Sequence, residues 1–138
     1  STGSSTIDEI DHAVDIIRKN EIPFCLMHAV SSYPTNDEDI NFKVIKSLQE
    51  RYDCPVGYSG HEKGVGLTVS SIAFGACIIE RHFTLDRTMK GPDHASSVEP
   101  TGLKLIVERA RRLHKAMGSP KIDVYDCELA NRKKFRGY

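Results

Sequence analysis

Apolar residues recur at helical spacing in four stretches of the chain, and short continuous apolar runs separate these stretches. The first helix is predicted to begin at the Thr6-x-x-Glu9 capping signal, and Arg18 and Lys19 suit its last turn. The predicted helices are residues 6–20, 37–52, 67–74 and 103–117. The predicted strands are residues 24–28, 55–58 and 77–83.

Strands that alternate with helices over short loops predict an α/β protein built from parallel βα units. Three strands cannot close a barrel, and a complete (β/α)₈ barrel takes about 250 residues. The pattern therefore fits a little under half of a TIM (β/α)₈ barrel, although it leaves a doubly wound sheet open. We expect residues 1–118 to form the barrel part. Residues 119–138 lack helical periodicity and are expected to be a linker or tail.

The balance of acidic and basic residues argues against a nucleic acid or a membrane surface as a partner. The 138 residues include 19 Lys plus Arg and 19 Asp plus Glu, which is unlike the basic surface of a nucleic-acid or membrane-surface binder. No apolar run is long enough for a membrane helix, and no signal peptide is recognisable, so we expect a cytoplasmic chain. Four scattered cysteines without a Cys-x-x-Cys pair are expected to be free thiols. Because the chain begins at Ser1 in the middle of a strand-to-helix unit, we expect further residues upstream.

Histidines mark the ends of the predicted strands. His28, His61 and His82 each lie at or just after a strand end, and His94 lies in the loop after the last strand. Side chains at the carboxyl edge of a parallel sheet converge, so these residues are candidates for one site. His61 and His82 are the natural pair, because their separation of one helix-and-strand unit places them on adjacent strands. Two imidazoles in this arrangement can bind a divalent cation.

Other polar residues at the same edge are weaker candidates. Glu80 can orient a metal ligand or contact substrate. Glu62 could be a third ligand, but its glycine-flanked loop favours a solvated carboxylate. Asp93, in the polar turn after the last strand, could hold sugar hydroxyls. Serines at strand ends can receive a phosphate. They are Ser1, Ser31, Ser32 and Ser59.

Taken together, six short motifs resemble the N-acetylneuraminate (sialic acid) synthase family, in family-like order and spacing from Ser1 to about Gly118. The motifs are Ser1-Thr2-Gly3, Met27-His28 through Ser32-Tyr33-Pro34-Thr35, Gly57-Tyr58-Ser59-Gly60-His61, Glu80-Arg81-His82-Phe83-Thr84-Leu85-Asp86, Gly91-Pro92-Asp93-His94 and Glu99-Pro100.

The resemblance implies a transferase that condenses phosphoenolpyruvate with N-acetylmannosamine or a related hexosamine, giving a nine-carbon 2-keto sugar acid and phosphate. It implies that His61 and His82 bind a divalent metal, manganese or alternatively magnesium, and that the full-length enzyme is a homodimer. It further implies that the chain forms the C-terminal half of a TIM (β/α)₈ barrel and that Glu80 and Asp93 are catalytic. The positions that match phosphoenolpyruvate-binding residues are Ser1, Ser31 and Ser59, and those that match sugar-contacting residues are Tyr33, Glu80 and Asp93.

Departures from the family leave alternatives open. Ser31 stands where many relatives have Asn, and the tail ends near where relatives continue into an antifreeze-like domain. Because relatives supply catalytic glutamates and a phosphate-binding lysine from the preceding half, the isolated segment is expected to be inactive. Legionaminate and pseudaminate synthases share the chemistry and differ in the sugar. A metal-dependent aldolase and a non-catalytic barrel fragment are further alternatives.

Overall fold

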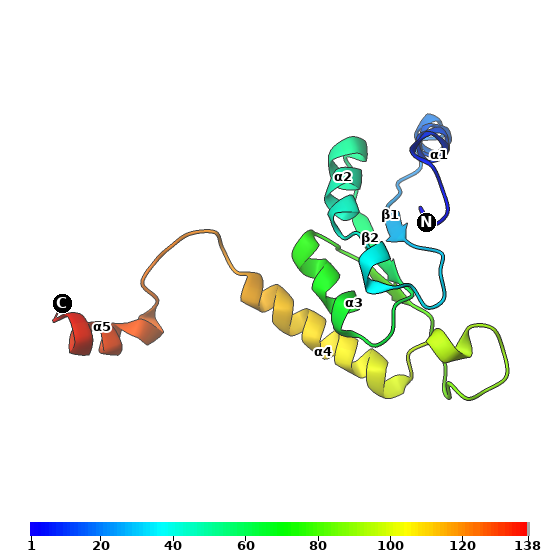
Figure 1. Cartoon of the computed structure of the whole chain (residues 1–138). Helices are drawn as coiled ribbons and strands as arrows, with labels where there is room; N and C mark the ends of the chain where they lie inside the picture. The colour runs from blue at the N-terminus through cyan, green and yellow to red at the C-terminus, as the bar shows by residue number, and fades with distance from the viewer. Residues whose placement is uncertain (138) are drawn as a thin grey trace.

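The computed structural model describes residues 1–137 and contains a three-stranded parallel sheet with helices packed along it (Figure 1). The strands are β1 (Leu26–Ala29), β2 (Val56–Gly60) and β3 (Ile79–Arg81), and they lie in chain order. All three predicted strands are confirmed, although β3 begins two residues later and ends two residues earlier than expected. The parallel pairing confirms the predicted βα units.

Short segments outside these strands extend both edges of the sheet. The backbone N–H of Thr2 donates to the carbonyl oxygen of Met27 at 2.9 Å, beside β1. At the other edge, Phe83 and Val98 form a parallel bridge. The sequence did not predict either contact, because one or two paired residues carry no alternation that could be recognised.

Four helices follow the predicted order, with one correction. They are α1 (Ile7–Lys19), α2 (Lys43–Tyr52), α3 (Gly66–Ser70) and α4 (Pro100–Met117). Thr6 caps α1 through the predicted capping box with Glu9. The prediction that α2 begins at the acidic residues was wrong. Asp37–Asp39 form the separate 3₁₀ helix η1, and Asn41, with φ of 52°, interrupts the helical path before α2.

The segment after α3 tightens into the 3₁₀ helix η2 (Ser71–Phe74). The predicted stop at Gly75 is confirmed, because its φ of 101° is a conformation that favours glycine. η2 contacts both α2 and α4, so this short stretch joins neighbouring helices on the same side of the sheet.

Buried apolar residues form two clusters between the sheet and the helices. In the larger cluster, Val14 of α1 and Ile45 of α2 pack against Val56 and Tyr58 of β2. The smaller cluster joins Val69 of α3 to residues of α4. Residues of β2 that face the helices are therefore the even-numbered ones, and the odd-numbered residues point to the opposite side, called here the open face.

An exposed ion pair also connects α1 and α2, away from the ends of the strands. Arg51 Nε donates to Asp11 Oδ1 at 2.9 Å, and the hydroxyl of Tyr52 donates to the same oxygen at 2.8 Å. The bonds from Arg51 and Tyr52 lower the pKa of Asp11 to about 2.

The tail differs from the expectation of a segment without helix. After α4 the chain is irregular to Tyr125, then forms η4 (Asp126–Glu128) and the helix α5 (Leu129–Arg136), which lies apart from the other helices in Figure 1. Its periodicity was missed because α5 buries no residue and needs no apolar face. The four cysteines are free, as predicted. Among the described residues, no helix is long and apolar enough to cross a membrane.

We predict that Ile45→Ala lowers the free energy of unfolding by about 2–5 kcal/mol, because Ile45 is fully buried in the larger cluster and the change leaves a cavity. Urea denaturation measures this difference. Ile22→Ala is the matched control, since Ile22 is 56% exposed and its loss should cost no more than about 0.5 kcal/mol. Equal effects of the two changes would contradict the assigned core.

Candidate metal and substrate site

The strand register brings the two predicted metal-binding histidines together on the open face. Ser59 pairs with Glu80 and Gly60 pairs with Arg81, so the residues that follow, His61 and His82, come side by side. Their ring centroids are 5.3 Å apart, with an interplanar angle of 78°. The prediction that these two rings lie on adjacent strands is confirmed.

Hydrogen bonding fixes the orientation of the His61 ring. Nδ1 of His61 lies 2.8 Å from the carbonyl oxygen of Val30, and because a carbonyl only accepts, Nδ1 is the protonated nitrogen. This tautomer leaves a lone pair on Nε2, with Ser59 Oγ at 3.5 Å. An imidazole held through one nitrogen by a backbone carbonyl is the usual arrangement of a histidine that binds metal through the other.

Tyr33 and Asp93 border the histidine pair. The ring of Tyr33 lies 4.3 Å from that of His61 and 5.5 Å from that of His82, measured between centroids. Nδ1 of His82 is 3.9 Å from Asp93 Oδ2, an ion-pair distance beyond that of a hydrogen bond. His94 joins His82 and Asp93 in lining a recess of about 270 Å³. The structure thus brings Tyr33 and Asp93 to the metal candidates.

Glu80 lies on the same face as the histidine pair. Glu80 of β3 pairs with Ser59 of β2, and the side chains of paired residues in parallel strands project to the same side of the sheet. Glu80 is exposed there.

The predicted phosphate-binding serines fall into two places. Ser59 is buried beside His61. Ser1 and Ser31 gather around Gly3, where an added Cβ would lie 2.4 Å from Ser31 Oγ and 3.7 Å from Ser1 Oγ. Glycine therefore allows the N-terminal segment to approach the residues that follow β1.

Two imidazoles fit a divalent cation that keeps most of its coordination positions open. Among the described residues, no group of three or more His, Cys, Asp or Glu side chains could hold a metal ion. The pair His61 and His82 would therefore supply two ligands and leave the other positions to water or substrate. An open coordination sphere is typical of metals that act on substrates and not of structural metals.

The expectation that His28 converges with the other strand-end histidines is wrong. His28 pairs in register with Tyr58, so its side chain projects toward the helices, away from the open face. Its Nε2 donates to the carbonyl oxygen of Ile40 at 2.6 Å, and its ring centroid lies 6.0 Å from that of Tyr58. His28 is a buried structural residue. Its place near a strand end was predicted correctly, but the side of the sheet on which its side chain lies was not.

The expectation of a solvated Glu62 is also wrong. Glu62 is 1% exposed and its Oε2 accepts from the hydroxyl of Tyr58 at 2.9 Å. Its Oε1 accepts from Arg81 Nη1 at 3.2 Å and from Thr68 Oγ1. Residue 62 falls on the helix side of the sheet, so it is turned away from the metal candidates. Burial and the neighbouring carboxylate raise the pKa of Tyr58 well above its usual value.

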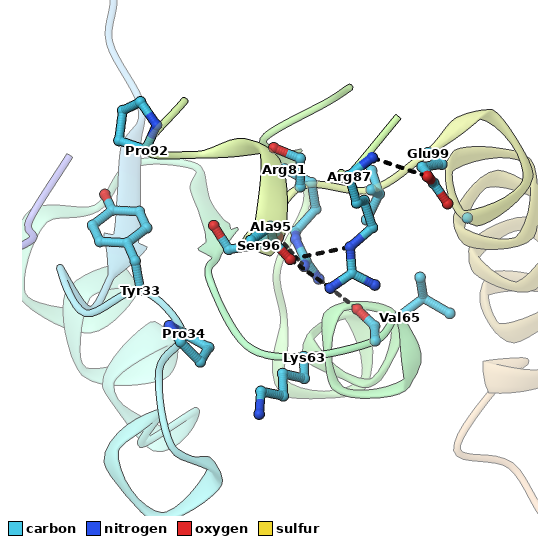
Figure 2. Close-up of a pocket in the computed structure, with 14 residues that line it drawn as sticks. Tyr33, Pro34, Lys63, Val65, Arg81, Arg87, Pro92, Ala95, Ser96 and Glu99 are labelled. Carbon is cyan, nitrogen blue, oxygen red and sulfur yellow. Dashed lines mark hydrogen bonds between the residues drawn. The ribbon is translucent and has the colours of Figure 1, made fainter. Parts of the chain in front are cut away.

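A pocket of about 280 Å³ is lined by Tyr33 and also by Arg81 of β3 (Figure 2). Figure 2 shows Tyr33 and Pro34 along one side of this pocket and Arg87 and Glu99 along another. The guanidinium of Arg87 donates to the carbonyl oxygen of Ala95, and the backbone N–H of Arg87 donates to Glu99 Oε1 at 3.1 Å. The sequence did not mark Arg87 or Lys63 as site residues, because exposed basic residues in loops are common.

Most of the chain matches a known protein family. Residues 1–122 match the NeuB family. The chain is 39% identical to the N-acetylneuraminate-9-phosphate synthase of Homo sapiens over 97% of this chain and 38% of that protein. It is 40% identical to the N,N'-diacetyllegionaminic acid synthase of Campylobacter jejuni, over 86% of this chain and 36% of that enzyme.

A solved structure shows the same fold. The N-acetylneuraminic acid synthetase of Leptospira borgpetersenii, crystallised with citrate, superposes with a TM-score of 0.84 at 39% identity, over 97% of this chain and 48% of that one. The chain thus spans less than half the length of these relatives. The predicted fold class, part of a TIM (β/α)₈ barrel, is confirmed by this likeness. The chain belongs to the NeuB family of sialic acid synthase-type proteins.

Proposed function

We propose that the whole protein condenses phosphoenolpyruvate with N-acetylmannosamine or a related N-acetylated hexosamine, releasing phosphate and forming a nine-carbon 2-keto sugar acid. The observation that carries the proposal is the pair of imidazoles, His61 and His82, whose ring centroids are 5.3 Å apart at the carboxyl edge of the sheet. The names of the relatives support a sugar-acid synthase of this class.

The proposed metal partner is Mn²⁺, held by His61 and His82. When bound, the cation supplies Lewis acidity that polarises the aldehyde of the open-chain sugar. His61 would bind through Nε2, because its Nδ1–H is already used at Val30. This hydrogen bond sets the ring before any ligand arrives and so reduces the loss of side-chain freedom on binding.

The substrates are assigned to the groups around this pair. We assign hydrogen bonds to phosphoenolpyruvate to three serine hydroxyls. They belong to Ser59, which is buried beside His61, and to Ser1 and Ser31, which lie around Gly3. Hydroxyl donors lower the cost of bringing its negative charge to the site. The rest of the phosphoenolpyruvate site would come from the remainder of the protein.

The sugar is assigned to the exposed side of the histidine pair. Tyr33, 49% exposed, covers both imidazoles and can pack against the sugar. Asp93 can accept hydrogen bonds from sugar hydroxyls. Glu80, exposed on the face that carries the metal candidates, is the candidate for proton transfer at the reacting centre.

The identity of the sugar is the main alternative within this class. A legionaminate or pseudaminate synthase would use the same metal and phosphoenolpyruvate groups with a different hexosamine. The residues around Tyr33 and Asp93 would then set the choice, because they face the proposed sugar position.

We predict that the whole protein releases inorganic phosphate when phosphoenolpyruvate, Mn²⁺ and an N-acetylated hexosamine are all present. Leaving out the sugar or the metal should abolish release. A phosphate-release assay over a panel of hexosamines also ranks the sugars. Formation of a sugar acid from pyruvate, without phosphate release from any hexosamine mixture, would support a metal-dependent aldolase and contradict the proposal.

We also predict that His61→Ala and His82→Ala each raise the Kd for Mn²⁺ by about tenfold or more, because each change removes one of two protein ligands. Manganese titration followed by electron paramagnetic resonance measures the Kd. His12→Ala is the control, since His12 is exposed on α1, far along the chain from the site. Unchanged Mn²⁺ affinity in both site variants would favour a non-catalytic module.

A further inference from the structure

A buried ion pair lies directly behind the two metal-binding candidates. Glu62 follows His61 in the chain, and Arg81 precedes His82. The side chains of Arg81 and Glu62 are 3% and 0% exposed, and Arg81 Nη1 lies 3.2 Å from Glu62 Oε1. Because successive side chains point to opposite faces of a strand, the ion pair faces the helices while the histidines face the other way.

Arg81 connects several segments through its two terminal nitrogens. Nη1 donates to the carbonyl oxygen of Gly64 at 2.8 Å and to Thr68 Oγ1 at 2.6 Å. Nη2 donates to the backbone carbonyl oxygen of Glu62 at 2.8 Å. Figure 2 shows the Arg81 side chain between Ser96 and the loop that carries Lys63 and Val65. One guanidinium thus holds the loop after β2 and the first turn of α3 against β3.

The Glu62 carboxylate completes this network. The hydroxyl of Tyr58 donates to its Oε2 at 2.9 Å, and Thr68 donates to its Oε1. Ionised groups at this depth are costly to bury, and replacing such a pair by apolar residues is often neutral for stability. The network therefore contributes mainly a fixed geometry, since a planar guanidinium with several acceptors tolerates little displacement.

The two histidines differ in how much their own rings are held. His61 is fixed through Val30 and is 7% exposed. The His82 side chain is 31% exposed, and its contact with Asp93 is 3.9 Å long. The backbone of His82 accepts a hydrogen bond from the N–H of Val98 at 2.8 Å. The position of the His82 ring therefore depends on its backbone, and hence on the neighbouring Arg81.

We propose that Glu62 and Arg81 are positioning residues that set the spacing of His61 and His82 and thereby the affinity of the site for its divalent cation. This inference rests on the proposed metal function of the two histidines. Neither side chain is a proposed ligand of the metal. It acts through the peptide links to its neighbours, from the helix side of the sheet.

Manganese binding to the whole protein tests this role. Arg81→Met keeps much of the side-chain length but removes every hydrogen bond, and it should raise the Kd for Mn²⁺ by about tenfold. Titrations are made where circular dichroism shows each variant fully folded. Arg51→Met is the matched control, because it removes the exposed ion pair with Asp11 between α1 and α2. Its Kd should stay within about twofold of the wild type, as expected for a surface pair.

A double variant covers the case in which Arg81→Met does not fold. Arg81→Met with Glu62→Gln leaves no unpaired buried charge, so it should fold more stably than the single variant. It should still bind Mn²⁺ more weakly than the wild type, because the fork of hydrogen bonds is absent. Proton–nitrogen correlation spectra without metal give a second readout. The ring signals of His61 and His82 should shift, while those of exposed His12 and His114 should not.

Each outcome separates the two claims. If the wild type does not bind Mn²⁺, or if His61→Ala and His82→Ala bind as tightly as the wild type, the metal site and the positioning role both fail. If the histidine variants lose affinity but the Arg81 and double variants keep it, with unshifted ring signals, only the positioning role is overturned. An equal loss in Arg51→Met would also overturn it, because general destabilisation would then explain the effect.

Discussion

The alternation of side chains on two neighbouring parallel strands is the constraint on which the site depends. Pairing of Gly60 with Arg81 puts His61 beside His82 on one face and Glu62 near Arg81 on the other. A shift of β3 by one residue against β2 would turn His82 toward the helices and Arg81 toward the open face, which would separate both pairs. The same register thus fixes the candidate metal ligands and the ion pair behind them.

The helices contribute to the site by burying the charged pair. α3 places Thr68 against Glu62, and the segment before α4 brings Ser96 near Arg81. Within this cover the Nε of Arg81 is the one buried side-chain polar atom without a hydrogen-bond partner among the described residues. Burying this N–H without a partner costs free energy. The cost is consistent with a side chain whose two terminal nitrogens are held in a fixed geometry while Nε is left without a hydrogen bond.

Much of this arrangement could be predicted from the sequence. Strand ends could be located because the apolar runs stop a few residues before His61 and His82, and the spacing of one βα unit made these residues neighbours. The face of each residue was harder to predict. His28 was misassigned because the face on which its side chain lies depends on where β1 begins, which the apolar run did not fix. Glu62 was misassigned because a loop glycine does not reveal that the following turn packs under α3. Arg81 was missed because it stands between Glu80 and His82 at the polar end of β3, so its charge did not stand out as that of a buried residue.

The sequence pattern alone did not show whether the sheet belongs to a barrel. Three strands in order fit both a barrel and an open sheet, and the likeness to the Leptospira borgpetersenii synthetase decides between them. The bridge between Phe83 and Val98 shows how the sheet continues past β3 toward α4. A bridge of this length has no sequence signature of its own.

The most direct measurement of the central claim is pulsed electron paramagnetic resonance of the Mn²⁺-loaded whole protein with ¹⁵N-labelled histidine. Magnetic coupling between the Mn²⁺ electrons and ¹⁵N nuclei reports the imidazoles that are bound directly to the cation. We expect coupling to two histidine nitrogens, with one lost in His61→Ala and the other in His82→Ala. Coupling to no histidine nitrogen in the wild type, or an unchanged pair in both variants, would contradict it.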